Sequence, residues 1–262
     1  MAAYKFGTLY SGSSGNSTYV GTEESGILID LGKNAKQSEL ALSRMNVDPT
    51  AVKAVFLTHE HVDHIRGLRV FCNRYHTPVY GSLGTLQALD RMGELNGAFP
   101  VYQMLSAADV EDYHIECFHT MHDAAESMGY TITLPNGTKT AVSTDLGVVT
   151  EEVRHAILGS RVILLESNHD IDMLNDGPYP YYLKKRILSD RGHLSNDAAA
   201  VMCEELLQSG TTQILLGHLS TNNNLPELAY QTSANRLKRA GATKADLSLT
   251  VAPRHEPFVT EV

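Results

Sequence analysis

Hydrophobic and polar positions alternate along this chain in two successive rounds of strand-like segments followed by helix-like ones. Apolar alternation bounded by turn residues predicts strands at 4–10, 17–21, 26–31, 51–57, 113–118, 129–134, 138–143, 162–166, 213–216 and 247–252. Apolar residues at helical spacing predict helices at 37–45, 65–75, 83–95, 150–158, 179–189, 195–208 and 226–240. Asn136-Gly137 marks a tight hairpin between two of the strands. Periodicity alone therefore predicts one domain of mixed α and β structure.

The segment 58–64, Thr-His-Glu-His-Val-Asp-His, places four potential metal ligands directly after an apolar run. A strand that ends here directs His59 and His61 to one side, because alternate residues of a strand share a face. Asp63 and His64 then begin the next element and face the same place. Imidazole nitrogens and carboxylate oxygens together suit zinc, manganese or iron. The pattern therefore predicts a metal site rather than a solvated polar turn.

The spacing His59-x-His61-x-Asp63-His64 resembles the signature of the metallo-β-lactamase fold, whose hydrolases usually hold two metal ions. That family expects a His, an Asp and a last His downstream, each near a strand end. His122, Asp145 and His218 occur here in that order. The resemblance covers most of the chain and implies an α+β fold, a four-layer αββα sandwich. It further implies a single domain over residues 1–262 with no inserted second domain.

The same resemblance implies two groups of metal ligands joined by one bridging carboxylate. The first group is His59, His61 and His122. The second group is Asp63, His64 and His218, and the bridge is Asp145. The two divalent ions, zinc or manganese with iron also compatible, would share a hydroxide that attacks the substrate. Asp63 is the candidate catalytic residue that orients this hydroxide and later passes a proton to the leaving oxygen.

A loop rich in small residues precedes the second predicted strand. Its sequence over 11–17 is Ser-Gly-Ser-Ser-Gly-Asn-Ser, and glycines let a backbone approach a ligand closely. We assign Ser14 and Asn16 to substrate binding on this basis. Read alone, the loop is equally well a flexible hairpin connection.

Polar residues also follow the buried strand predicted at 162–166, where active-site loops commonly lie. Asn168 and His169 are therefore candidate substrate-binding residues. His193 precedes a predicted helix, and backbone donors at a helix N-terminus favour a phosphate. We assign His193 to the phosphate or the leaving group, as a substrate-binding and catalytic candidate. A structural role in the loop that caps the helix is the alternative.

Four segments are similar to the YycJ/WalJ group of bacterial metallo-β-lactamase-fold proteins. They are 11–17, His-Asp-Ala-Ala-Glu at 122–126, Glu-Ser-Asn-His-Asp at 166–170 and Gly-His-Leu-Ser-Thr-Asn-Asn at 217–223. This resemblance implies a metal-dependent phosphodiesterase that acts on nucleic acid, a 5′-to-3′ DNA exonuclease linked to DNA repair. Related processing nucleases clamp nucleic acid with an inserted domain, for which the interval between Asp145 and His218 is too short. An open cleft that accepts short or single-stranded ends is therefore expected.

The composition adds expectations about solubility, membrane partners and location but does not change the expected fold or site. The chain is 42% hydrophobic and 19% charged, as in an ordinary soluble globular protein. It has no apolar run near the roughly 18 residues that cross a bilayer, so no membrane partner is expected. Three widely spaced cysteines in apolar contexts predict buried reduced thiols. Together with an N-terminus unlike a signal peptide, they predict a cytoplasmic protein.

Two other functions stay open. A small-molecule hydrolase of the same fold (a cyclic-phosphate phosphodiesterase, a lactonase or a thioesterase) is slightly favoured by the formal net charge of −9. Basic clusters at 66–74 and 184–191 weaken the argument from net charge, because they could contact nucleic acid. Such runs are, however, commonly solvated helix faces. A binding protein with a structural metal is disfavoured, because structural sites need no second ion. The native metal, DNA against RNA, the polarity of digestion and the oligomeric state are not determined by the sequence.

Overall fold

The computed structural model of the chain describes residues 3–95, 98–243 and 245–262. Residues 1–2, 96–97 and 244, which the expected domain over 1–262 includes, lie outside the described residues. The strands of the first sheet lie in the order β14 (Phe258–Glu261), β1 (Lys5–Tyr10), β2 (Ser17–Gly21), β3 (Gly26–Ile29), β4 (Val52–Phe56), β5 (Val79–Gly81) and β6 (Val101–Gln103). Those of the second lie in the order β13 (Ser248–Val251), β12 (Gln213–Gly217), β11 (Val162–Glu166), β10 (Lys139–Ser143), β9 (Met128–Thr133), β8 (Tyr113–His119) and β7 (Ala107–Val110).

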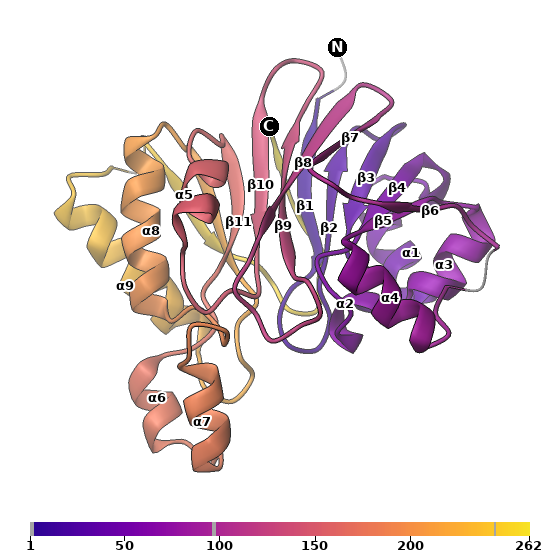
Figure 1. The fold of residues 1–262 in the computed structure, drawn as a ribbon. Helices are drawn as coiled ribbons and strands as arrows, with labels where there is room; N and C mark the ends of the chain where they lie inside the picture. The colour runs from indigo at the N-terminus through magenta and orange to yellow at the C-terminus, as the bar shows by residue number, and fades with distance from the viewer. Residues whose placement is uncertain (1–2, 96–97, 244) are drawn as a thin grey trace.

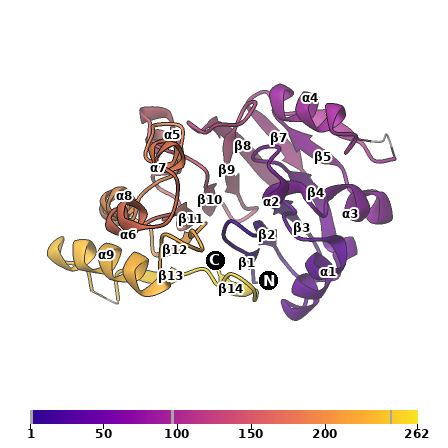
Figure 2. The same ribbon diagram turned by 90° about the horizontal axis from the view of Figure 1, so that it is seen from below.

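Helices cover the outer face of each sheet (Figures 1 and 2). Those on the first sheet are α1 (Ala35–Arg44), α3 (Leu68–Tyr75) and α4 (Leu83–Arg91). Those on the second are α5 (Glu151–Ile157), α8 (Asn196–Gln208) and α9 (Pro226–Arg239). The short helices are η1 (Pro49–Ala51), α2 (Val62–Ile65), α6 (Ile171–Asp176) and α7 (Tyr181–Ile187). The expected αββα sandwich is confirmed, and α6 and α7 project below its layers in Figure 1.

Three apolar clusters fill the three interfaces between the four layers. Neighbouring residues of a strand point to opposite faces, so each inner strand supplies two of these clusters. In β3, Ile29 lies between the sheets and Leu28 packs toward the helices. In β11, Leu164 lies between the sheets, whereas Ile163 and Leu165 pack against the second helix layer. Burial on both faces explains why these strands read as almost continuous apolar runs.

Each sheet joins antiparallel strands to a run of parallel ones. Strands β3 to β6 are parallel in the first sheet, and β10 to β13 are parallel in the second. The carboxyl ends of parallel strands meet at one edge of a sheet, and ligand sites of α/β sheets lie beyond such edges. In Figure 1 this is the lower edge of the sandwich, and Figure 2 looks directly onto it.

The described structure corrects several predicted boundaries. The helix expected over 65–75 is interrupted, because α2 ends at Ile65 and α3 begins at Leu68. Gly67 lies between them with its N–H bonded to Leu31 O at 2.8 Å, and a Cβ there would lie 2.2 Å from Lys33 O. The strands β5, β6, β7 and β14 and the helix α6 were not predicted. Within the described residues, no helix combines the length and apolarity that a membrane crossing requires.

The three cysteines are free thiols, as expected. Cys72 and Cys203 are buried, and burial raises the pKa of each to about 12. Cys117 is only half-buried, which differs from the prediction. Cys117 lies in β8, next to the edge strand β7, and packs against the apolar cluster between the sheets.

Candidate metal centre

Loops at the carboxyl ends of strands bring the predicted metal ligands to the lower edge of the sandwich. The motif 59–64 follows β4, and His122 lies in the connection between β8 and β9. Asp145 follows β10 and His218 follows β12. Asp145 and His218 adopt positive φ angles of 58° and 55°, a left-handed conformation that is uncommon outside glycine and common at functional sites. Residues far apart in the sequence therefore meet at one place.

The first predicted ligand group is assembled in the structure. His59, His61 and His122 each offer a ring nitrogen, and these atoms lie within 4.8 Å of one another. The ring centroids of His59 and His61 are 4.4 Å apart, and those of His61 and His122 are 5.2 Å apart. His59 and His122 are buried, whereas His61 is half-buried. Three imidazoles at this separation suit one divalent ion.

The second group, Asp63, His64 and His218, is likewise gathered within 4.8 Å. Asp145 lies between the two groups. Its carboxylate oxygens are 3.3 Å from His64 Nε2, 3.4 Å from His218 Nε2 and 3.7 Å from His122 Nε2. One buried carboxylate therefore faces histidines of both groups, which is the arrangement that a bridging ligand requires.

Several atoms at this centre are buried without a hydrogen-bond partner among the described residues. They are His59 Nε2, His122 Nε2, His218 Nε2 and Asp145 Oδ2. Buried polar atoms nearly always have a hydrogen-bond partner in folded proteins. Four without one at the same place therefore indicate a bound group that is not part of the chain. A divalent cation accepts such nitrogen and oxygen lone pairs, so the residues present fit bound metal.

The opposite ring nitrogen of each buried histidine is held by an outer group. His64 Nδ1 lies 2.8 Å from Asp30 Oδ2, and His218 Nδ1 lies 2.9 Å from Glu166 Oε1. His122 Nδ1 lies 3.0 Å from the carbonyl oxygen of Gly192. Such partners fix the orientation of a ligating ring and leave Nε2 directed at the metal. Asp30 and Glu166 were not predicted as site residues. Their only signal is a carboxylate at the end of a buried apolar strand.

Carboxylates decide which histidines hold a proton in the metal-free centre. Burial disfavours the charged form of His64, but Asp145, Asp30 and Asp63 outweigh it and raise the pKa to about 9. The pKa of His218 is raised well above its usual value, although burial opposes this, because Asp145, Asp63 and Glu166 lie close. Burial and the neighbouring histidines hold the pKa of His59 well below its usual value. Binding of metal must therefore displace protons from the His64 side.

The early loop contacts the metal ligands through Asn16 and reaches the cavity through Ser13. Asn16 is buried, and its Oδ1 accepts a hydrogen bond from Gly12 N at 2.8 Å. Its Nδ2 lies 3.1 Å from His64 Nε2. Ser14 Oγ accepts a hydrogen bond from Lys33 Nζ at 3.1 Å, and the neighbouring Ser13, not Ser14, lines the cavity.

A cavity of about 250 Å³ lies over both ligand groups. Of the predicted substrate contacts, Asn168 and His193 line it. Asn168 Nδ2 donates to His218 O at 2.8 Å, and His193 Nδ1 lies 2.7 Å from Glu166 Oε1. His169 is buried outside the lining, with neither ring nitrogen hydrogen-bonded within the described chain.

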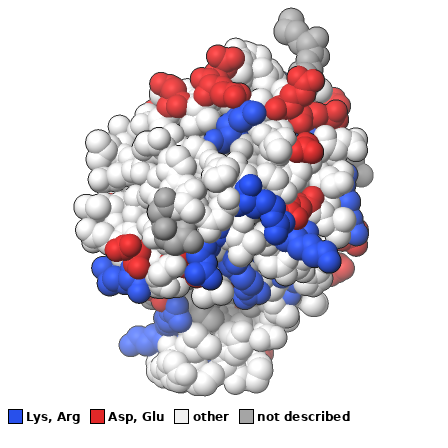
Figure 3. Space-filling view, turned by 90° about the vertical axis from the view of Figure 1, so that its right-hand side faces the viewer, with Lys and Arg blue, Asp and Glu red and all other residues white. Residues whose placement is uncertain are grey.

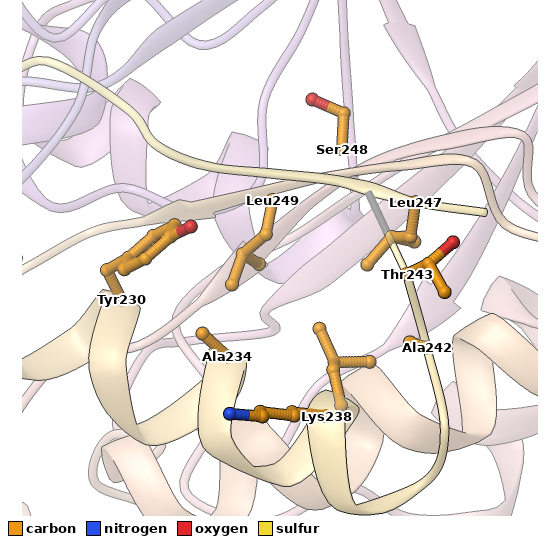
Figure 4. Close-up of a pocket in the computed structure, with 9 residues that line it drawn as sticks. Tyr230, Ala234, Lys238, Ala242, Thr243, Leu247, Ser248 and Leu249 are labelled. Atoms are coloured by element: carbon orange, nitrogen blue, oxygen red, sulfur yellow. The ribbon is translucent and has the colours of Figure 1, made fainter. Parts of the chain in front are cut away.

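A second cavity, of about 630 Å³, lies between α9 and β13 (Figure 4). Its lining includes Leu237, Leu247 and Leu249 together with Tyr230 and Lys238. None of its described lining residues is a His, Cys, Asp or Glu. Size alone therefore does not locate the chemistry, which lies in the smaller cavity over the metal ligands.

Comparison with known proteins agrees with this geometry. A family model described as a β-lactamase superfamily domain matches residues 26–219. Exodeoxyribonuclease YycJ of Bacillus anthracis is 39% identical over 241 residues, which cover 90% of this chain and 90% of that protein. Exodeoxyribonuclease WalJ of Streptococcus pneumoniae is 35% identical over 241 residues, 90% of this chain and 89% of that protein. Zinc-bound PqqB of Methylobacterium extorquens matches 98% of this chain and 100% of its own with a TM-score of 0.72; at 16% identity this likeness shows the fold alone.

The residues matched by the family model include the motif 59–64, His122, Asp145 and His218. The similarity to the YycJ/WalJ group, expected from four loop segments, is confirmed over most of the chain. The chain belongs to the β-lactamase superfamily and is a metal-dependent hydrolase of the metallo-β-lactamase fold.

Proposed function

We propose that this protein is a phosphodiesterase that hydrolyses nucleic acid, acting as a 5′-to-3′ DNA exonuclease with a role in DNA repair. The observation that carries the proposal is the position of Asp145, whose carboxylate faces His122 of one ligand group and His64 and His218 of the other. Paired metal ions suit in-line displacement at phosphorus, because they clamp both the attacking and the leaving oxygens. Two relatives, matched over 90% and 89% of their lengths, are named exodeoxyribonucleases.

Two divalent ions, zinc or manganese with iron also compatible, are the proposed cofactors. His59, His61 and His122 would hold one of them. Asp63, His64 and His218 would hold the other, and Asp145 would contact both. When bound, such ions lower the pKa of a water and stabilise negative charge on the phosphate.

The chain's own residues supply positioning and proton transfer. Asp63 lies at the cavity with its side chain 24% exposed, 3.6 Å from both His64 Nε2 and His218 Nε2. Burial tends to raise the pKa of Asp63, but His218 and His64 outweigh it and lower this pKa. The carboxylate is therefore ionised and available to orient the nucleophile. His193 is held at Nδ1 by Glu166, which leaves Nε2 for the phosphate or the leaving oxygen.

Helix α7 carries side chains suited to contact with nucleic acid. Leu183 and Arg186 of this helix line the cavity, while Tyr181 and Tyr182 are 81% and 74% exposed. Exposed aromatic rings beside cationic side chains form stacking platforms for unpaired bases. No domain is inserted between β11 and α8 in the described chain beyond the helices α6 and α7, which supports a single domain with an open cleft. This arrangement favours single-stranded ends over a clamped duplex.

A small-molecule hydrolase is the second candidate. The cavity of about 250 Å³ is the size of a small ligand rather than of an oligonucleotide. A cyclic phosphodiester, a lactone or a thioester is then the substrate, with the same ligand groups.

A substrate panel separates the two. The protein, reloaded with manganese or zinc, is given single- and double-stranded DNA and RNA, a cyclic mononucleotide, a lactone and a thioester. The proposal predicts that a nucleic acid has the highest kcat/KM and that chelation abolishes its cleavage. Faster turnover of the lactone, the thioester or the cyclic mononucleotide would replace it with the second candidate.

A further inference from the structure

Three cations gather beside the Asp63–His64–His218 group: Lys33, Arg66 and Arg254. Burial lowers the pKa of Lys33, and the charges of Arg66 and Arg254 lower it further, while Asp63 acts in the opposite direction. The chain positions agree, because Gly67, next to Arg66, packs against Lys33 O, and Arg254 Nη2 donates to Leu219 O, next to His218. Like charges at short range repel, so an anion among them relieves an unfavourable arrangement.

Carboxylates do not neutralise these three cations. Among the described residues, none of Lys33, Arg66 and Arg254 has an Asp or Glu oxygen within 4.0 Å. By contrast, Arg69 and Arg74 of the same basic stretch pair with Glu94 and Glu39. On the face seen in Figure 3, Lys and Arg gather across the middle and lower half and Asp and Glu toward the top. The net charge of −9 therefore conceals a local excess of positive charge.

Two of these cations lie beside the glycines of the loop 11–16, and at Gly15 a side chain would collide with Lys33. A Cβ on Gly15 would lie 2.7 Å from Cδ and Cε of Lys33, and Gly15 has a φ of 156°. A Cβ on Gly12, whose φ is 124°, would lie 3.5 Å from Arg254 Nε. Gly15 thus leaves room for the Lys33 side chain against the loop.

Hydrogen bonds join both side chains to residues near the cavity. Lys33 Nζ donates to Ser14 Oγ at 3.1 Å, and Arg254 Nη1 donates to Thr221 Oγ1 at 2.6 Å. Thr221 Oγ1 lies 3.2 Å from the hydroxyl of Ser13, which lines the cavity. Arg254 is therefore linked through Thr221 to a residue that lines the cavity, and Lys33 is bonded to Ser14, the next residue of the loop.

Backbone hydrogen bonds tie the same segments to the metal motif. Asn16 N donates to Asp63 O at 2.8 Å, and Gly32 N donates to Asn16 O at 2.8 Å. Leu31 N donates to His64 O at 2.7 Å. The loop 11–16 and the backbone that carries Lys33 are thus set at a fixed offset from the ligands Asp63 and His64, which favours a preorganised binding site.

We propose that Lys33, Arg66 and Arg254 form a phosphate-binding site for a substrate phosphate next to the one that is hydrolysed. The inference rests on the proposed function and names the part of the substrate that this side of the cavity holds. Guanidinium and ammonium groups are the side chains that bind phosphate oxygens. The phosphate is either the diester of the neighbouring nucleotide or a 5′-terminal phosphate, which share this anionic chemistry.

The test compares Lys33→Gln, Arg66→Gln and Arg254→Gln with Arg74→Gln, a matched loss of charge at the ion pair with Glu39. Each metal-loaded protein is assayed on a single-stranded oligonucleotide with a 5′-phosphate, on the same strand with a 5′-hydroxyl, and on bis-p-nitrophenyl phosphate. Binding of the 5′-phosphorylated strand to metal-free protein is measured over a salt series. This second readout does not depend on catalysis.

We expect each variant of the three cations to lose about tenfold more kcat/KM on an oligonucleotide than on bis-p-nitrophenyl phosphate, chiefly through KM. The slope of log affinity against log salt should fall by about one per cation removed, and Arg74→Gln should match the wild type. A loss of kcat/KM confined to the 5′-phosphorylated strand would identify the bound group as the terminal phosphate. An equal loss on both strands would identify it as the neighbouring diester.

Equal losses on the oligonucleotides and on bis-p-nitrophenyl phosphate would overturn the phosphate site, as would an unchanged salt slope. In either case nucleic-acid cleavage by the wild type still stands. A wild type that cleaves none of the oligonucleotides would remove the proposed function and this site together.

Discussion

One carboxylate oxygen of Glu166 lies 2.7 Å from Nδ1 of His193. The same oxygen lies 2.9 Å from Nδ1 of His218, so a single buried anion orients both a metal-ligand candidate and a cavity histidine. Burial opposes ionisation of Glu166, but His193 and His218 outweigh it and hold its pKa well below the usual range. Its other oxygen accepts a hydrogen bond from Leu146 N at 2.8 Å, next to Asp145. Glu166 therefore links the metal centre to the residue proposed to contact the phosphate.

Replacement of Glu166 by Gln should weaken metal binding. The amide retains the shape of the side chain but loses the charge that orients His218 and increases its basicity. Loss of such a partner reduces metal affinity by about 10- to 100-fold. Zinc or manganese affinity is measured by chelator competition, with Glu204→Gln on the surface as control and circular dichroism to check the fold. Unchanged affinity in a folded Glu166→Gln protein would contradict this role.

Replacement of His193 by Gln should reduce turnover without removing metal. The ring lines the cavity and is not needed to complete either proposed ligand group. If it transfers a proton to the leaving oxygen, kcat on bis-p-nitrophenyl phosphate should fall by ~10²-fold or more. Metal content per chain is measured in parallel, with His114→Gln as the control. Wild-type kcat, or a drop in metal content that matches the loss of kcat, would refute the assignment.

The exposed tyrosines of α7 should matter only for substrates with bases. A double Tyr181→Ala, Tyr182→Ala variant loses the proposed stacking surface, and each stacked base contributes ~1–3 kcal/mol. We therefore expect affinity for single-stranded DNA to fall about tenfold or more. Fluorescence anisotropy with a labelled strand measures it, and Tyr230→Ala on α9 is the matched control. Equal affinity of the double variant and the control would exclude α7 from DNA binding.

Burial of His169 predicts a loss of stability in acid. Burial lowers the pKa of its imidazole to about 4 in the folded chain, against about 6.5 when unfolded. Between these values the unfolded state binds the extra proton, so stability is complete above pH ~6.5 and falls as the pH drops toward 4. The contribution is ~1.4 kcal/mol per pH unit and ~3 kcal/mol in all.

Urea unfolding of metal-free protein between pH 4.5 and 7.5 measures this dependence. The free energy of unfolding of His169→Gln should fall less steeply with decreasing pH than that of the wild type. His155→Gln, a change at an exposed position of α5, should follow the wild type. Parallel slopes for all three proteins would show that His169 is not the group responsible.

Segments with strong local patterns were predictable from the sequence. The apolar run before His59 gave both β4 and the position of the motif, and Asn136-Gly137 gave the hairpin between β9 and β10. By contrast, β5 and β6 have three residues each, too few for any alternation to be recognised. Strand β14 has four residues, of which only Phe258 and Val259 are apolar, again too few for an alternation to be recognised.

The outer partners of the metal centre were not predictable for a different reason. Asp30 and His64 are 34 positions apart, and Glu166 and His218 are 52 apart. Each pairing depends on which strands become neighbours and on the left-handed turns at Asp30 and His218. Local sequence does not encode that proximity. The same holds for Lys33 and Arg254, which meet only through the loop 11–16.

The most direct test of metal-dependent nucleic-acid hydrolysis at this centre is digestion of single-stranded DNA labelled at the 5′ or the 3′ end. The wild type and Asp63→Ala are each reloaded with manganese. Asp63→Asn, which keeps the size of the side chain, is assayed beside them to separate loss of the carboxylate from misfolding. We predict early release of the 5′ label as mononucleotide and gradual shortening of the 3′-labelled strand, with both absent in the Asp63 variants. DNA left intact by the metal-loaded wild type, or digestion that persists without Asp63, would contradict the account.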